Sequence, residues 1–209
     1  MMEEVIKHLH WLGHDSFMLD YGTVIYFDPY QIPKGSPEAD LILITHDHFD
    51  HCSPADVQNL SSGDTVVVTN ASSAKQLSGK VEILKAGETL EVKNVKIEAF
   101  PAYNTNKKFH PKKSGGLAFL LNIEGISIYH AGDTDLIEEM NTIHPDIALL
   151  PVSGTYVMTA DEAAKAALNM QPEIAIPMHY GSIVGSEKDA VRFKKLLAGQ
   201  IEVLIMQKE

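Results

Sequence analysis

The stretch ADLILITHDHFDHCSP, residues 39–54, places several metal-binding side chains directly after an apolar run. The run over 39–45 is short and continuous, which is typical of a buried strand. The side chains that follow it are His46, His48, Asp50 and His51. Imidazole and carboxylate groups together suit zinc, iron or manganese. An ordinary polar turn does not need the H-x-H-x-D-H spacing, so this spacing after a rigid strand predicts a metal site.

Two metal positions follow from the directions of these side chains. In an extended segment, side chains two positions apart point the same way, so His46 and His48 can reach one point. Asp50 and His51 lie past the strand end and can reach a second point nearby. More ligands are expected at the carboxyl ends of other apolar runs, because binding residues gather on loops that a rigid scaffold positions. Two side chains stand at such ends, Asp133 in ISIYHAGDTD and His179 in EIAIPMHYG.

The first half of the chain, roughly residues 1–100, predicts a hairpin followed by strands that alternate with short helices. The hairpin turns about Tyr21-Gly22. Ser53 is placed to cap a helix over 54–60, and Asn70 can cap a second helix. Strands are expected at 39–45, 65–70, 81–84, 88–92 and 95–100.

The second half, roughly residues 115–209, repeats this order. A hairpin turns about Glu124-Gly125, and Thr159 caps a helix over 160–170. Further elements are strands at 146–152, 173–180 and 201–206 and a helix at 186–199. Two mixed β-sheets packed face to face with helices outside satisfy both halves, which predicts an α/β protein of the α+β type in one domain over 1–209.

Composition and charge narrow the classes of partner. The chain has 17 basic and 28 acidic residues and a net charge of −11, so it should repel duplex nucleic acid. No apolar run reaches the roughly 18 residues that a membrane helix needs. The stretch MMEEVIKHLHW lacks the features of a signal peptide, and the one cysteine, Cys52, cannot form an internal disulfide. These features predict a cytoplasmic protein without a membrane partner and leave a homo-oligomer open.

Three motifs in one order resemble the metallo-β-lactamase superfamily of hydrolases. They are His46-x-His48-x-Asp50-His51, Gly132-Asp133-Thr134 and Pro177-Met178-His179. GHDSFML, IYFDPY and IYHAGDTD are similar to landmarks of the branch that includes ascorbate-6-phosphate lactonase. The resemblance covers nearly the whole chain. It implies an αββα four-layer sandwich of two mixed β-sheets with outer helices, and a dinuclear metal site between the sheets.

The resemblance also implies a role for each motif residue. His46 and His48 would bind the first metal, and Asp133 would bridge both metals. The second metal would take Asp50, His51 and His179. The expected ions are two Zn²⁺, with Mn²⁺ or Fe²⁺ as alternatives, and a bridging water or hydroxide would be the nucleophile. Asp50 can also hold or accept the proton of that nucleophile, which makes it the expected catalytic residue.

One ligand of the family pattern is displaced in this chain. Many members carry a histidine soon after the strand that here covers 95–100, where Pro101 stands at the nearest matching place. We expect His110, on the segment 102–116 that has no clear element, to supply the missing imidazole. A loop of that length is more often functional than accidental. The alternatives are a first site with only two histidines and Asp133, or an approach by Tyr103 or Asn104.

Other residues are expected near the site without binding metal directly. His14 matches an early position of the family and is expected at the edge of the site, although a turn histidine is an equal alternative. The resemblance suggests that Asp28 orients a ligand histidine. His130 falls earlier on its strand than Asp133 and is expected beside the ligands. Tyr156 belongs to a loop that can line a substrate pocket.

Metal-assisted hydrolysis is the leading hypothesis for function. Two cations would activate a shared water and polarise a substrate oxygen. The cations and the lysines within 107–113 favour a small, anionic substrate such as a phosphodiester, a sugar-phosphate lactone or a related ester. Because the same fold hosts persulfide dioxygenases, a non-haem iron oxidoreductase is one alternative. A non-catalytic metal-binding protein is the other.

Overall fold

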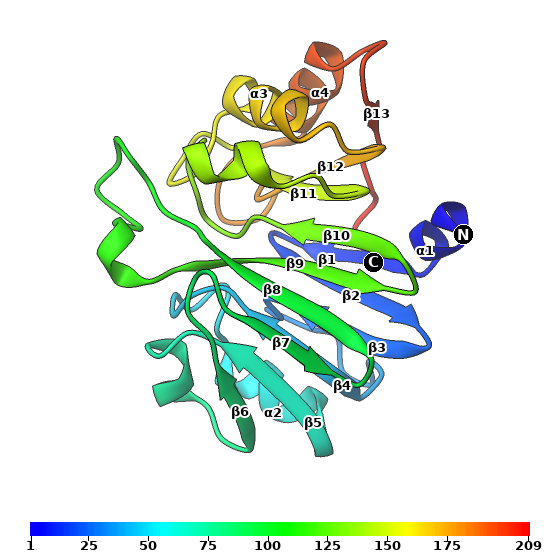
Figure 1. Cartoon of the computed structure of the whole chain (residues 1–209), viewed down its shortest axis with the longest axis vertical. Coiled ribbons are helices and arrows are strands. Elements are labelled where there is room, and N and C mark those ends of the chain that lie inside the picture. The colour runs from blue at the N-terminus through cyan, green and yellow to red at the C-terminus, as the bar shows by residue number, and fades with distance from the viewer.

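The computed structural model describes residues 1–209 as two mixed β-sheets with a few helices (Figure 1). The first sheet has six strands in chain order. These are β1 (Leu9–Gly13), β2 (Ser16–Tyr21), β3 (Thr23–Phe27), β4 (Ala39–Ile44), β5 (Ser61–Thr69) and β6 (Lys80–Ile83). The pairs β1–β2 and β2–β3 are antiparallel, and the pairs from β3 to β6 are parallel.

The second sheet has seven strands, which also lie side by side in chain order. They are β7 (Thr89–Val92), β8 (Val95–Pro101), β9 (Leu117–Ile123), β10 (Ile126–His130), β11 (Ile147–Pro151), β12 (Ile174–Met178) and β13 (Glu202–Val203). Its first pairs, from β7 to β10, are antiparallel, and its later pairs are parallel. Both sheets therefore begin with hairpins and continue with parallel strands, as the order of apolar runs predicts.

Four α-helices complete the fold. They are α1 (Met2–Lys7), α2 (Pro54–Leu60), α3 (Ala160–Met170) and α4 (Glu187–Leu196). Helices α3 and α4 pack on each other and on β11 and β12 of the second sheet (Figure 1). The predicted fold of two mixed sheets with outer helices is confirmed. No helix of the chain is long and apolar enough to cross a membrane.

Strand β4 explains why its residues 41–44 are apolar on both faces of the strand. Leu41 and Leu43 point into the core between the sheets, whereas Ile42 and Ile44 pack under α2. All four are fully buried, and burial of such a side chain contributes about 2 kcal/mol. The strand is therefore held from both faces, which gives the polar turn after Thr45 a rigid base.

Side-chain caps set the helix starts where the sequence places them. Ser53 accepts a hydrogen bond from the amide of Asp56 at the start of α2. Thr159 forms a capping box with Glu162 at the start of α3. Asn70 accepts from the amide of Ser73, but the helix that follows is only a short 3₁₀ turn.

Three expectations need correction. The first sheet ends at Ile83 and the second begins at Thr89, so the hairpin β7–β8, expected in the first half, pairs in the second sheet. The last strand, expected over 201–206, pairs only at Glu202–Val203. After Val203 the chain crosses to the first sheet, where the amide of Glu209 donates to the carbonyl of Trp11 at 3.0 Å. Helix α1 and strand β1 were not predicted.

Candidate metal centre

A tight turn after β4 gathers the histidines of the opening motif. The amides of His51 and Cys52 both donate to the carbonyl of His48, at 3.1 and 2.8 Å. The turn brings the rings of His46 and His51 to a centroid distance of 4.1 Å. Across the gap between the sheets, the amide of Leu117 donates to the carbonyl of Thr45 at 2.9 Å. The second sheet is therefore tied to the first directly beside this turn.

A first group of ligand atoms comes from His46, His48 and His110, which lie within 4.8 Å of one another. His110 brings its Nε2 to 2.9 Å from Nδ1 of His48. The same Nε2 lies 3.3 Å from Oδ2 of Asp133. The loop therefore brings His110 next to His48 and Asp133.

A second group surrounds the other oxygen of Asp133. Oδ1 of Asp133 lies 3.4 Å from Nε2 of His51 and 3.3 Å from Nε2 of His179. Oδ2 of Asp50 lies 3.8 Å from Nε2 of His51. Asp133 therefore presents one carboxylate oxygen to each group, and it stands between them.

The donor atoms at the centre of these groups fit a cation. Nε2 of His46, Nε2 of His51 and Oδ1 of Asp133 are buried, yet none has a hydrogen-bond partner within the protein. Buried polar atoms are nearly always paired in native proteins. Imidazole nitrogens and a carboxylate oxygen that converge without partners are a donor set for a divalent transition metal.

The electrostatics of the centre also favour positive charge. Burial opposes charge on His179, but the carboxylates of Asp133 and Asp15 outweigh it and raise its pKa to about 9. Burial likewise opposes charge on His51, and Asp133 and Asp28 outweigh it, so the pKa of His51 lies well above its usual value. His46 is the opposite case, because burial holds its pKa well below the usual value. Buried carboxylates here attract protons or cations.

Asp28 contacts His51, the kind of contact that the resemblance implies. Nδ1 of His51 donates to Oδ2 of Asp28 at 2.7 Å. Asp28 also accepts from the amide and the hydroxyl of Thr45, at 2.8 and 2.7 Å. These bonds leave Nε2 of His51 as the free ligand atom, which is the usual arrangement of a metal-binding histidine.

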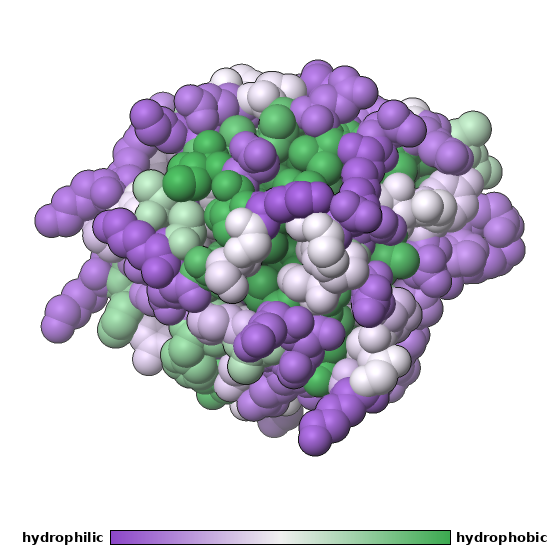
Figure 2. Space-filling view, turned by 90° about the horizontal axis from the view of Figure 1, so that it is seen from below, coloured by the Kyte–Doolittle hydropathy of each residue, from purple (hydrophilic) through white to green (hydrophobic).

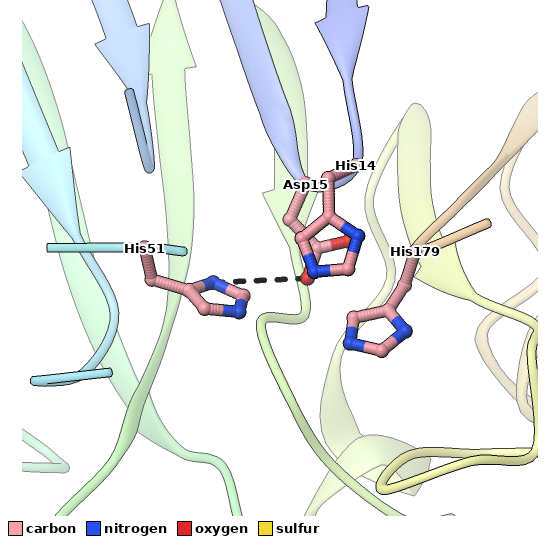
Figure 3. A group of neighbouring side chains, drawn as sticks. All are labelled: His14, Asp15, His51 and His179. Carbon is pink, nitrogen blue, oxygen red and sulfur yellow. Dashed lines mark ion pairs between the residues drawn. The ribbon is translucent and has the colours of Figure 1, made fainter. Parts of the chain in front are cut away.

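His14 and Asp15 approach the second group from the turn between β1 and β2. Figure 3 shows them between His51 and His179. Nε2 of His14 lies 3.1 Å from Oδ2 of Asp50, and its ring is 4.2 Å from the ring of His179. His14 is thus at the site itself and is not an ordinary turn histidine.

Asp15 was not predicted from the sequence. Its carboxylate is fully buried, and neither oxygen has a hydrogen-bond partner. Oδ2 lies 3.8 Å from Nδ1 of His51 (Figure 3). Burial and the nearby charge of Asp133 raise its pKa well above the usual value. The only available signal was its position directly after His14 in the stretch GHDS.

The remaining predicted residues lie beside the centre or outside it. Asn104 supports the loop of His110, because its Nδ2 donates to the carbonyls of Phe109 and Tyr156 at 3.0 and 2.5 Å. His130 is buried beside the centre, and its Nε2 contacts the carbonyl of Asp15 at 2.8 Å.

The side chain of Tyr103 extends toward Glu139. The amide of Asp135 donates to its carbonyl, and the hydroxyl of Thr134 bonds to the same oxygen. The backbone is therefore held against the 134–135 segment, and the ring extends to Glu139, to which its hydroxyl donates at 3.0 Å. Tyr103 lines neither of the two pockets that contain His110, so the structure gives no contact that supports it as the alternative to His110.

The loop that carries His110 is tied to the segment after Asp133. Asp135 accepts from the amide of Thr105 at 2.7 Å and forms an ion pair with Lys107. Lys112 pairs with Glu139 at 2.8 Å. Two of the lysines that were expected to attract anions therefore fasten the loop.

Left-handed backbone is concentrated at the centre. Ten non-glycine residues have a positive φ, and five of them are site residues: His14, Asp28, His110, Tyr156 and His179. Such conformations are costly for residues with a Cβ, and they persist where surrounding structure holds them. The precise directions of the ligand side chains are thus imposed by the fold.

A pocket of about 480 Å³ opens onto both groups of ligand atoms. Its polar wall is formed by His14, His48, Asp50, His110, Asp133 and His179. This volume is in the range of small-molecule sites. The arrangement is therefore a substrate-sized pocket with a metal-binding wall.

Comparisons with known proteins agree with this geometry. Residues 8–179 match the family described as a β-lactamase superfamily domain. A UPF0173 metal-dependent hydrolase of Methanoregula boonei is 35% identical, over 90% of this chain and 88% of the relative. A solved structure from Parabacteroides distasonis, whose assignment as a metal-dependent hydrolase is provisional, is 38% identical with a TM-score of 0.86, over 96% of this chain and 93% of that one.

A more distant structure shows the fold alone. The diiron β-hydroxylase CmlA from Streptomyces venezuelae has a TM-score of 0.74 but only 13% identity, over 95% of this chain and 52% of that one. The ascorbate-6-phosphate lactonase branch stays a prediction. The family match and the relatives nevertheless place the chain: it belongs to the metal-dependent hydrolases of the metallo-β-lactamase superfamily.

Proposed function

We propose that this protein binds two divalent metal ions, with Zn²⁺ as the preferred ion, and hydrolyses a small ester, phosphodiester or lactone. The observation that carries the proposal is the position of Asp133. Its Oδ2 lies 3.3 Å from His110 and its Oδ1 lies 3.3 Å from His179, so one carboxylate serves two groups of histidines. His46, His48 and His110 would hold one ion, and Asp50, His51 and His179 would hold the other.

Bound divalent ions would supply Lewis-acid chemistry, which lowers the pKa of a coordinated water from 15.7 toward about 7 and polarises the oxygen of the scissile group. The protein would contribute a base beside that water. Asp50 lines the pocket and contacts Nε2 of His14 at 3.1 Å. Burial opposes ionisation of Asp50, but the hydrogen bond from His14 and the charge of His51 outweigh it and lower its pKa. Asp50 thus remains a carboxylate that can accept a proton from the attacking water.

His14 would act through Asp50. Its ring is buried and packs between His51 and His179, at centroid distances of 5.6 and 4.2 Å. The contact from Nε2 of His14 is to Oδ2 of Asp50, the oxygen that also lies 3.8 Å from Nε2 of His51, so His14 holds the carboxylate beside the second ligand group. The left-handed backbone of His14 fixes the direction of this imidazole toward Asp50.

The test is metal analysis of protein purified without chelators, followed by assays with p-nitrophenyl esters, bis(p-nitrophenyl) phosphate and simple lactones. We expect two metal ions per chain and turnover that Asp133→Asn and His48→Ala abolish. Asp20→Asn is the matched control, because Asp20 is exposed on β2 outside the pocket. Turnover that survives Asp133→Asn would remove this centre from the mechanism.

The iron oxidoreductase is the alternative that the same experiment tests. Tightly bound iron, with oxygen uptake when a thiol persulfide is added, would show that the protein is a dioxygenase and not a hydrolase. Protein that stays metal-free in the presence of Zn²⁺ or Mn²⁺ would instead favour a non-catalytic role.

A further inference from the structure

Exposed apolar side chains gather at the mouth of the metal-binding pocket. The chain has nine large hydrophobic residues with exposed side chains, and four of them line this one pocket. They are Phe49 at 66% exposure, Phe109 at 46%, Ile183 at 42% and Tyr156 at 41%. Val184 adds to the same wall. These residues come from four loops that are distant in the sequence, so the fold has brought them together.

The loops belong to the site that binds metal. Phe49 follows His48 in the turn after β4, Phe109 precedes His110, and Ile183 follows His179 by four positions. Phe109 meets Tyr156 edge to face at 4.9 Å, and Phe49 meets Tyr30 at 5.8 Å. The apolar wall is therefore built by aromatic contacts next to the ligands.

Apart from its histidines, the pocket offers no basic side chain to an anion. No lysine or arginine lines it, and its lining contains three aspartates, at positions 47, 50 and 133. Lys107 and Lys112 are paired with Asp135 and Glu139. The part of a substrate that lies beyond the metal-binding wall thus meets apolar carbon and acidic oxygen, which favours an uncharged apolar group.

Shape argues for a small molecule in preference to a protein partner. Exposed apolar residues also occur elsewhere, and Figure 2 shows apolar side chains between polar ones on the face seen from below. The pocket differs because it is concave and holds about 480 Å³, a volume that suits a small molecule. A stable protein interface would bury a total of about 1,200 Å² or more.

We infer that the substrate carries an uncharged aliphatic or aromatic group, which binds against Phe49, Phe109, Tyr156 and Ile183 while the reacting bond faces the histidines. The inference rests on the proposed function, because it assigns the substrate class of that same site. It selects acyl or aryl esters and alkyl-substituted lactones over small polar ones.

The test measures binding and turnover separately. Binding of acetamide and hexanamide to the zinc-loaded protein is compared by nuclear magnetic resonance titration. Each buried methylene strengthens binding roughly fourfold, so a partly open pocket should prefer hexanamide at least about tenfold. Phe109→Ala and Ile183→Ala should reduce that preference to about threefold or less. Turnover of p-nitrophenyl acetate and p-nitrophenyl hexanoate should follow the same order.

Ile83→Ala is the matched control, because Ile83 is 50% exposed on β6 and lies outside the pocket. This variant should keep the full preference for hexanamide. Equal binding of the two amides by the wild type would overturn the inference, as would loss of the preference in Ile83→Ala. A dimer that Phe49→Ala dissociates would also overturn it, because a second copy would then cover the wall. Retained preference without turnover of any ester, phosphodiester or lactone would contradict the proposed function and leave the binding of an apolar group intact.

Discussion

His110 places its Nε2 2.9 Å from Nδ1 of His48, although the two residues are 62 positions apart in the chain. His48 lies in the turn after β4 of the first sheet, and His110 lies on the long loop between β8 and β9 of the second sheet. The two imidazoles meet because Asp135 and Glu139 hold the loop through Lys107 and Lys112. This meeting joins the two sheets at the metal centre and makes the loop part of the site.

Removal of the loop histidine should cost one metal ion. His110→Ala leaves only His46, His48 and Asp133 around the first position, so the protein should retain about one zinc ion per chain after desalting. The measurement is elemental analysis against protein concentration. His8→Ala is the control, because His8 is exposed and belongs to no group of ligand atoms. Full retention by His110→Ala would exclude a ligand role for this residue.

The carboxylate behind His51 should tune metal affinity. Asp28→Asn keeps the size of the side chain but removes the charge that holds Nδ1 of His51 at 2.7 Å. Loss of such a partner lowers metal affinity about 10–100-fold. Competition with a chromophoric chelator measures this loss, and circular dichroism checks that the fold persists. An unchanged affinity would mean that Thr45 and the fold orient His51 without the carboxylate.

The ion pair between Lys107 and Asp135 should position His110. Lys107→Ala removes the contact to a carboxylate that is only 2% exposed, so the loop should open and zinc affinity at one position should fall about tenfold. Proteolysis within 105–112 should become faster in the metal-free protein. Lys108→Ala is a close control, since the neighbouring lysine is exposed and forms no ion pair. If both variants behave alike, the ion pair does not position the loop.

Metal affinity should rise with pH up to about 9. The pKa of His179 is raised to about 9, so below that pH a proton must leave this imidazole before it can bind a cation. Metal binding should therefore release protons, which calorimetry in buffers of different ionisation enthalpy detects. The stability of the metal-free protein should change with pH in the opposite direction. A raised pKa stabilises the metal-free protein below the unfolded value of 6.5, and this stabilisation is lost as the pH rises toward 9.

Local spacing explains which parts could be predicted. The continuous apolar run of β4, the caps at Ser53 and Thr159 and the histidine turn each depend on a few neighbouring residues, and the structure has them in place. The resemblance implied that Asp28 orients a ligand histidine. The contact with His51 arises because Asp28 directly follows β3, which pairs with β4.

Contacts between distant segments could not be predicted with the same certainty. Nothing in the sequence around Tyr103 shows that its ring extends to Glu139, because a loop side chain takes its direction from tertiary contacts. Asp15 was missed because a buried carboxylate without a partner follows no local rule. Strand β13 is short because the chain then crosses to Trp11 of the first sheet. The pattern of hydrophobic residues does not predict this crossing.

The number of zinc ions per chain tests the central claim most directly. Metal-free protein is titrated with Zn²⁺, and bound metal is counted by elemental analysis after desalting. The account predicts two ions for the wild type and fewer than two for Asp133→Asn, because this carboxylate faces both groups of histidines. A wild type that binds no more than one ion, or an Asp133→Asn variant that holds two as tightly, would contradict a centre shared by two metals.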